Sequence, residues 1–134
     1  MADIPFLLAL RQESMDGHLA ASGLAIDDAS RRTRVMHYFD CAEILLGDGE
    51  RIGLFKLRRS PGDWEIVQIQ LVSVAQGRGI GRSLLRETLA DAAVAGVPVR
   101  LSVLKANPAK RLYEDLGFKV FDEDAHEFHM RRDA

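Results

Sequence analysis

A glycine-rich turn between a strand-like run and a helix-like run constrains this 134-residue chain more than any other feature. The apolar run over residues 66–72 precedes Gln76-Gly77-Arg78-Gly79-Ile80-Gly81, and a helical pattern follows from Arg82 to Ala95. Glycines let backbone N–H groups approach a ligand closely, and a helix dipole favours negative charge at its N-terminus. The turn therefore predicts a phosphate site, although glycines that serve only a tight strand-to-helix turn would also explain it.

The spacing of these glycines excludes two common phosphate loops. A P-loop requires G-x-x-x-x-G-K-[ST], and no Lys-Ser or Lys-Thr pair follows the glycines here. The dinucleotide fingerprint G-x-G-x-x-G fails in both registers, because Arg82 or Leu84 stands where the last glycine is required. The pattern that remains is Q-x-x-G-x-G.

The order of the other patterns predicts an α+β fold with a mixed, mostly antiparallel sheet flanked by helices. Asp48-Gly49 marks a hairpin, and the strand, helix and strand around the glycine loop give one parallel strand pair. Helices are expected over 3–15 (with Asp3 as N-cap), 27–39, 82–95 and 107–117, an irregular segment over 16–25, and strands over 42–46, 52–57, 64–74, 97–103, 118–121 and 127–131. Without linkers or repeats, residues 1–134 read as a single domain.

A second motif lies one helix and one strand after the glycine loop. Asn107, Tyr113 and Gly117-Phe118 follow the order N-x-x-x-x-x-Y-x-x-x-G-F. Taken alone, a helix N-cap at Asn107 and packing of Tyr113 on a helix face would explain these residues. Together with Q-x-x-G-x-G, the segment resembles the acyl-CoA elements of the GNAT superfamily of N-acetyltransferases, and the resemblance covers roughly residues 41–131.

This resemblance implies acetyl-CoA as the acyl donor and a parallel strand pair that splays apart to hold its pantetheine arm. Asn107 and the main chain of Leu71, Val72 and Ser73 would bond the pantetheine, and Tyr113 would lie by the thioester sulfur. The pyrophosphate would lie on the loop and the helix start, at Gln76, Gly77, Arg78, Gly79, Ile80, Gly81 and Arg82. Members of this family usually begin with a strand, whereas this chain enters a helical pattern almost at once.

The implied chemistry is direct attack of an amine on the thioester. An alkyl ammonium has a pKa of about 10.4, so a base or a chain of waters must first remove a proton. Glu65 stands where histone-acetylating members of the superfamily carry a catalytic Glu, although a solvent-facing carboxylate beside Asp63 is the alternative interpretation. Main-chain N–H groups at the strand end would polarise the carbonyl, and Tyr113 would be the general acid toward the thiolate. No Ser-His-Asp or Cys-His pairing is evident from the sequence.

Composition limits the remaining classes of function. A net charge of −2 disfavours a nucleic-acid partner, no apolar segment is long enough for a membrane span, and one cysteine with four unclustered histidines predicts no metal. We expect a cytoplasmic enzyme that acetylates a primary amine of a small molecule or peptide, with a homodimer left open, and a non-catalytic acyl-CoA sensor as the alternative. The acceptor wall is expected to be mostly apolar and poorly suited to a polycation, around Met15, His18, Met36, Phe55 and Trp64.

Overall fold

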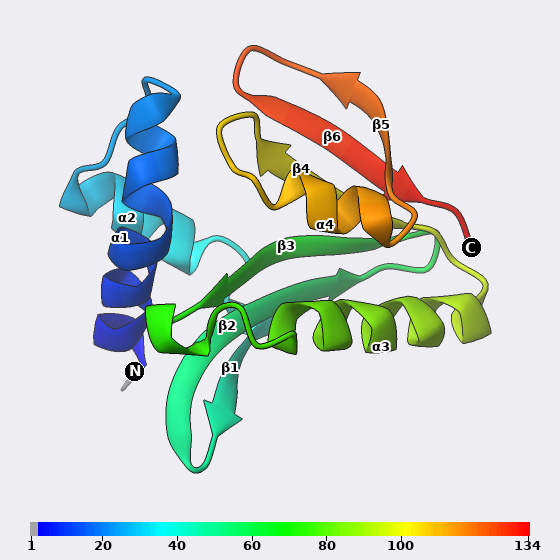
Figure 1. The fold of residues 1–134 in the computed structure, drawn as a ribbon, viewed down its shortest axis with the longest axis horizontal. Coiled ribbons are helices and arrows are strands. Elements are labelled where there is room, and N and C mark those ends of the chain that lie inside the picture. Colours follow the sequence, from blue (N-terminus) through cyan, green and yellow to red (C-terminus); the bar gives the residue numbers. More distant parts are fainter. Residues whose placement is uncertain (1–2) are drawn as a thin grey trace.

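A six-stranded sheet forms the centre of the computed structural model, which describes residues 3–134 (Figure 1). Its strands are β1 (Ala42–Gly47), β2 (Glu50–Arg59), β3 (Trp64–Leu71), β4 (Val99–Leu104), β5 (Lys119–Glu123) and β6 (Glu127–Arg132). They lie in the order β1-β2-β3-β4-β6-β5, and every neighbouring pair is antiparallel except β3 and β4. The mixed, mostly antiparallel sheet predicted from the sequence is confirmed.

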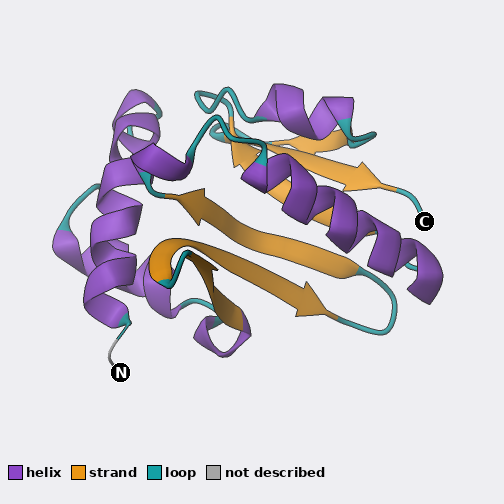
Figure 2. Cartoon of the chain, turned by 60° about the horizontal axis from the view of Figure 1, so that its bottom comes forward, coloured by secondary structure: helices purple, strands orange, loops and turns teal. Residues whose placement is uncertain are grey.

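Four helices flank this sheet: α1 (Ile4–Ala21), α2 (Asp28–Met36), α3 (Ile80–Ala95) and α4 (Lys110–Asp115), with 3-10 turns at Phe39–Cys41 and Ser73–Ala75 (Figure 2). The pair α1 and α2 packs on one face of the sheet, and α3 and α4 pack on the other. Successive strand residues point to opposite faces, so Leu54 and Phe55 of β2 belong to different cores. Leu54 packs with α1 and α2, whereas Phe55 packs in the core under α3 and α4.

The parallel pair separates along its length, which confirms the splay implied by the family resemblance. Hydrogen-bonded register between β3 and β4 covers the pairs Trp64–Val99, Glu65–Arg100 and Ile66–Leu101. Lys56 pairs with Gln68 and Leu57 with Ile66, so Val67 is an extra residue that forms a bulge in β3. Beyond Ile66, the edge of β3 that faces β4 has no partner strand.

The first helix is longer than predicted, and the irregular segment expected over 16–25 is wrong for residues 16–21. Gly17 lies on the exposed side of α1, where its missing side chain leaves no gap. A helical glycine costs about 1 kcal/mol relative to alanine. Burial of Leu19 and an ion pair from Asp16 to Arg31 on α2 offset that cost. The helix ends before Gly23, whose φ of +72° favours glycine.

Other boundaries shift by a few residues. The second helix ends at Met36 rather than near residue 39, and β3 ends at Leu71 rather than Val74, because the chain turns at Ser73–Ala75. Asp3 occupies the N-cap position of α1 without capping it, since its carboxylate pairs with Arg51 at 3.0 Å. None of the helices in the described part of the chain is both long and apolar enough to cross a membrane.

Candidate active site

A cleft of about 490 Å³ opens where β3 and β4 separate. Its walls are β3 from Glu65 to Gln70 and β4 from Leu101 to Leu104. The cleft is also bordered by Asn107, Tyr113, the turn at 124–127, and Arg11, Met15, Leu19, Leu24, Arg34 and His37 of the α1–α2 side. Two residues of the second motif therefore meet the predicted base, Glu65, at one cleft.

The glycine loop has the backbone conformation of an anion site. Gly77 and Gly79 have φ values of +74° and +78°, and a Cβ added at either would meet no atom within 4 Å. At the start of α3, Gly79 is the N-cap, and no side chain forms a capping hydrogen bond there. The first turn of this helix contains no acidic residue. The first N–H groups of a helix have no partner within it, so those of α3 are left to bind a ligand.

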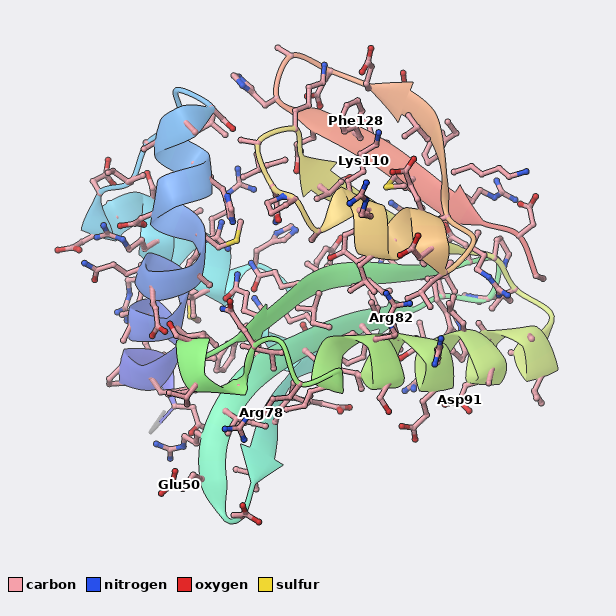
Figure 3. All side chains as sticks on the ribbon, in the orientation of Figure 1. Glu50, Arg78, Arg82, Asp91, Lys110 and Phe128 are labelled. Carbon is pink, nitrogen blue, oxygen red and sulfur yellow. The ribbon has the colours of Figure 1, made fainter. Side chains whose placement is uncertain are left out.

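Two arginines flank this helix start. Figure 3 shows Arg78 on the loop and Arg82 between α3 and α4. The Arg82 Nη2 lies 3.4 Å from the Asp115 Oδ2 at the end of α4. The side chain of Gln76 donates to the Leu71 carbonyl at 3.0 Å, which ties the loop to the end of β3. The loop thus combines free N–H groups with guanidinium groups, the donors that suit a pyrophosphate.

The main chain after β3 is engaged within the protein. The N–H of Val72 donates to the Ile52 carbonyl at 2.9 Å, and both the N–H and the hydroxyl of Ser73 donate to the Glu13 carboxylate. These bonds to Ser73 lower the pKa of Glu13. A pantetheine that bonded the N–H groups of Val72 or Ser73 would have to displace Ile52 or Glu13. Those two contacts stay predictions, and the unpaired edge of β3 nearer Ile66 offers a free alternative.

Tyr113 and Asn107 stand together at the α4 side of the cleft. Tyr113 is buried, its ring packs edge-on against Phe118 with 6.0 Å between centroids, and burial raises its pKa to about 12. The Asn107 Oδ1 accepts from the Ala109 N–H at 3.0 Å, which stabilises the turn before α4, although the N-cap position of that helix is Ala109 and not Asn107. Its amide NH₂ forms no hydrogen bond with any residue of 3–134 and can donate to a ligand in the cleft.

Glu65 lines the cleft but is held by two cations. Its carboxylate lies 3.5 Å from the Arg58 Nη1 and 3.2 Å from the Arg100 Nη1, and its side chain is 23% exposed. A proton on this carboxylate would weaken both ion pairs. Glu65 is therefore reachable from the cleft and has a structural role as well.

A Ser-His-Asp array that was not evident from the sequence lies on the neighbouring strands. The Ser102 Oγ is 2.7 Å from the His129 Nδ1, and the His129 Nε2 is 3.0 Å from the Asp124 Oδ2. Hydrogen bonds from the N–H groups of His126 and Glu127, and then from His129, lower the pKa of Asp124. Ser102 and Asp124 border the cleft, whereas His129, which joins them, does not. The array depends on the pairing of Ser102 with His129 between β4 and β6, a register that the sequence alone does not fix.

The acceptor wall differs from the sequence prediction. Of the five residues expected there, Met15 alone borders the cleft, while Phe55 and Trp64 pack in the core under α3. The wall carries charged groups, among them Arg11 and Arg34, so the expectation of a mostly apolar surface is wrong. No cluster of three or more His, Cys, Asp or Glu side chains that could hold a metal ion occurs within residues 3–134.

Comparisons with known proteins agree with this geometry. The model of the acetyltransferase (GNAT) domain family matches residues 39–120. A comparison with curated proteins gave no significant match. Among solved structures, the PaiA N-acetyltransferase of Thermoplasma acidophilum in complex with coenzyme A is similar, with a TM-score of 0.71 and 22% identity over 99% of this chain and 94% of that one.

Two further structures share this fold. An acetyltransferase from Thermus thermophilus has a TM-score of 0.76 and 22% identity over 99% of this chain and 92% of its own. The ribosomal-protein-S18-alanine N-acetyltransferase of Escherichia coli has a TM-score of 0.69 and 17% identity over 99% of this chain and 88% of its own. At these identities the similarity shows the fold. The family match covers most of the chain, and the protein belongs to the GNAT acetyltransferase family.

Proposed function

We propose that the protein is an N-acetyltransferase that transfers the acetyl group of acetyl-CoA to a primary amine of a small molecule or peptide. The main support is the cleft, where Tyr113 and Asn107 of the second motif face the unpaired edge of β3. A linear amide-containing chain such as pantetheine can hydrogen-bond to such an edge as an added strand would. The glycine loop at the start of α3 supplies the complementary site for the pyrophosphate.

In the proposed reaction the neutral amine attacks the thioester carbonyl carbon, the C–N bond forms, the C–S bond breaks, and the amine gives up its second proton. Free N–H groups on the edge of β3 would bond the carbonyl oxygen as negative charge develops there. Asn107 would hold the pantetheine arm through its free NH₂ group.

Tyr113 is proposed to act on the departing sulfur. With a pKa of about 12 its phenol is protonated at neutral pH and can donate to that sulfur. Complete transfer of this proton to a thiolate whose thiol pKa is near 8.5 would be uphill by about 5 kcal/mol. Tyr113 would therefore contribute chiefly through the hydrogen bond that it gives to the developing thiolate, and the proton that the thiolate finally takes up would come from water.

Two groups on the cleft wall are candidates for the base. Glu65 is the candidate that the family resemblance implies, and its carboxylate is within the cleft despite its two ion pairs. The Ser102 hydroxyl is the other, since His129, which it contacts, can accept the proton that it passes on, and Asp124 can stabilise the imidazolium that forms. In that case Ser102 would contact the amine, and His129 would act through it.

The test is calorimetric titration of the purified protein with acetyl-CoA, with ATP and NAD as controls, followed by CoA-thiol release with a panel of amines. We expect acetyl-CoA alone to bind, with thiol release that depends on an amine. Binding without amine-dependent release by any amine would favour the acyl-CoA sensor. Failure to bind acetyl-CoA would overturn the proposal and would show that the glycines serve only the tight turn between β3 and α3.

A further inference from the structure

Arg11 of α1 is a buried cation for which the proposed chemistry has no use. The residue is 5% exposed, and its Nε is buried without a hydrogen-bond partner. Its side chain makes no ion pair or hydrogen bond with any residue of 3–134. Burial lowers the pKa of Arg11 to about 10, with Arg34 adding to this effect and Asp16 opposing it. A guanidinium with so little exposure and no anion beside it costs stability, and an anionic ligand in the cleft would lower that cost.

The one other buried cation within residues 3–134, Lys56, has hydrogen-bond partners, whereas Arg11 has none. Lys56 is fully buried, and its ammonium donates to the carbonyls of Arg34, Val35 and His37 at 3.3, 2.7 and 2.6 Å, at the C-terminal end of α2. Asp16, the carboxylate that acts on Arg11 through its charge, is already held by Arg31 at 2.5 Å. The described part of the chain therefore provides Arg11 with no anion of its own.

The position of Arg11 indicates which ligand could provide that anion. Arg11 and Arg34 border both the cleft that holds Tyr113 and an adjoining hollow of about 440 Å³ between α1 and α2. Gln68 and Gln70 of β3 border the same cleft, and the side-chain carbonyl oxygen of each is buried without a partner. This wall thus joins unpaired cationic donors to unpaired carbonyl acceptors, the complement of a molecule that carries both a carboxylate and N–H groups.

We propose that Arg11, with Arg34 beside it, binds a carboxylate of the acyl acceptor, so that the acceptor is a small amino acid rather than a simple amine. The inference rests on the proposed acetyl transfer. A guanidinium matches a carboxylate with two parallel hydrogen bonds, which a point charge cannot reproduce. The near-complete burial of Arg11 suits a small ligand that enters the cleft whole, and the Gln68 and Gln70 carbonyls would accept from its N–H groups.

The first measurement needs no acetyl-CoA. N-acetyl amino acids, the products of the proposed reaction, are compared with their carboxamides at millimolar concentration by their effect on the melting temperature of the whole protein. We expect at least one acid to raise the melting temperature while its carboxamide does not, and Arg11→Met to abolish that difference. Arg11→Met itself should melt no lower than the wild type, because it removes an unpaired buried charge. Arg86→Met, at an exposed position of α3, is the matched control and should keep the difference.

The second measurement compares thiol release with each free amino acid and its carboxamide. The acid should be preferred by at least about tenfold in kcat/KM, and Arg11→Lys, which keeps the charge but loses the planar fork, should reduce that preference severalfold. Equal responses to every acid and its carboxamide, or a preference that survives in Arg11→Met, would overturn the carboxylate site. If acetyl-CoA binds but acids are not preferred over carboxamides, the carboxylate site is wrong and the proposed acetyl transfer stands. If acids bind in an Arg11-dependent way but acetyl-CoA does not bind, the proposed acetyl transfer is wrong and the carboxylate site stands. Arg11→Lys serves as the test if Arg11→Met does not fold.

Discussion

Gly79 and Gly96 stand at the two ends of α3 and provide a matched pair of substitutions. Their φ values are +78° and +72°, and a Cβ at either position would meet no atom within 4 Å. Alanine at each site would therefore cost only the strain of the left-handed backbone, about 1–2 kcal/mol. For a chain of this size we expect each variant to melt lower by about 3–8 °C, which a thermal unfolding experiment measures directly.

Acetyl-CoA affinity should separate these two variants. The methyl group of Gly79→Ala would occupy the open space at the helix start, where the pyrophosphate is proposed to bind. Each charge-assisted hydrogen bond lost there is worth about 1.5–3 kcal/mol, so calorimetry should show about ten- to a hundredfold weaker binding. Gly96→Ala, at the far end of the helix, should bind acetyl-CoA as the wild type does. Unchanged affinity in Gly79→Ala would refute the loop assignment, and an equal loss in both variants would point to strain in α3 instead.

Three further predictions concern the cleft and the sheet beneath it. Tyr113→Phe should lower turnover about a hundredfold with acetyl-CoA affinity nearly unchanged; because burial raises the Tyr113 pKa to about 12, the wild type and the variant should show the same pH profile below pH 10 when turnover is measured. If Glu65 is the base, Glu65→Gln should lower turnover about a hundredfold while Ser102→Ala and His129→Gln leave it unchanged, and the opposite ranking in steady-state assays would assign the role to the array. Gly53→Ala should lower the free energy of unfolding by about 1–3 kcal/mol, since its Cβ would lie 2.4 Å from the main-chain carbonyl oxygen of Gln70. A denaturant midpoint equal to that of the wild type would contradict this.

The features that the sequence predicted well are those set by local patterns. The glycine loop, the helix that follows it and the hairpin at Asp48-Gly49 depend on residues adjacent in the chain, whose φ values favour one conformation. The helix begins at Ile80, slightly earlier than the predicted start at Arg82. Asn107 and Tyr113, which both line the cleft, belong to one motif whose spacing is itself local. The splay of β3 from β4 was implied by the family resemblance and is confirmed by the strand register.

The features that were missed depend on contacts between distant segments. In the sequence Gly17 is typical of a helix end. In the structure α1 continues beyond it, because the Asp16–Arg31 ion pair with α2 and the burial of Leu19 stabilise the last turns. The Ser102–His129 contact requires the register of β4 on β6, and Arg11 reaches the cleft only because α1 packs against the sheet. The sequence does not show which face of β3 carries Trp64, since this depends on the β2–β3 register, and the residue packs in the core rather than in the acceptor wall.

The gap beside β3 explains how two substrates could reach one point from opposite sides of the sheet. Asn107 and Tyr113 lie on the α4 side, whereas Arg11 and Arg34 lie on the α1–α2 side, and all four border the same cleft. Strand pairing closes the described sheet on either side of this gap, so groups from the two faces can act on one ligand pair only beyond Ile66. Substitution of Asn107 should therefore change the apparent affinity for acetyl-CoA, and substitution of Arg11 should change the KM for the acceptor. An Arg11 variant that weakened acetyl-CoA binding as strongly as Asn107→Ala would show that the two faces are not separate binding surfaces.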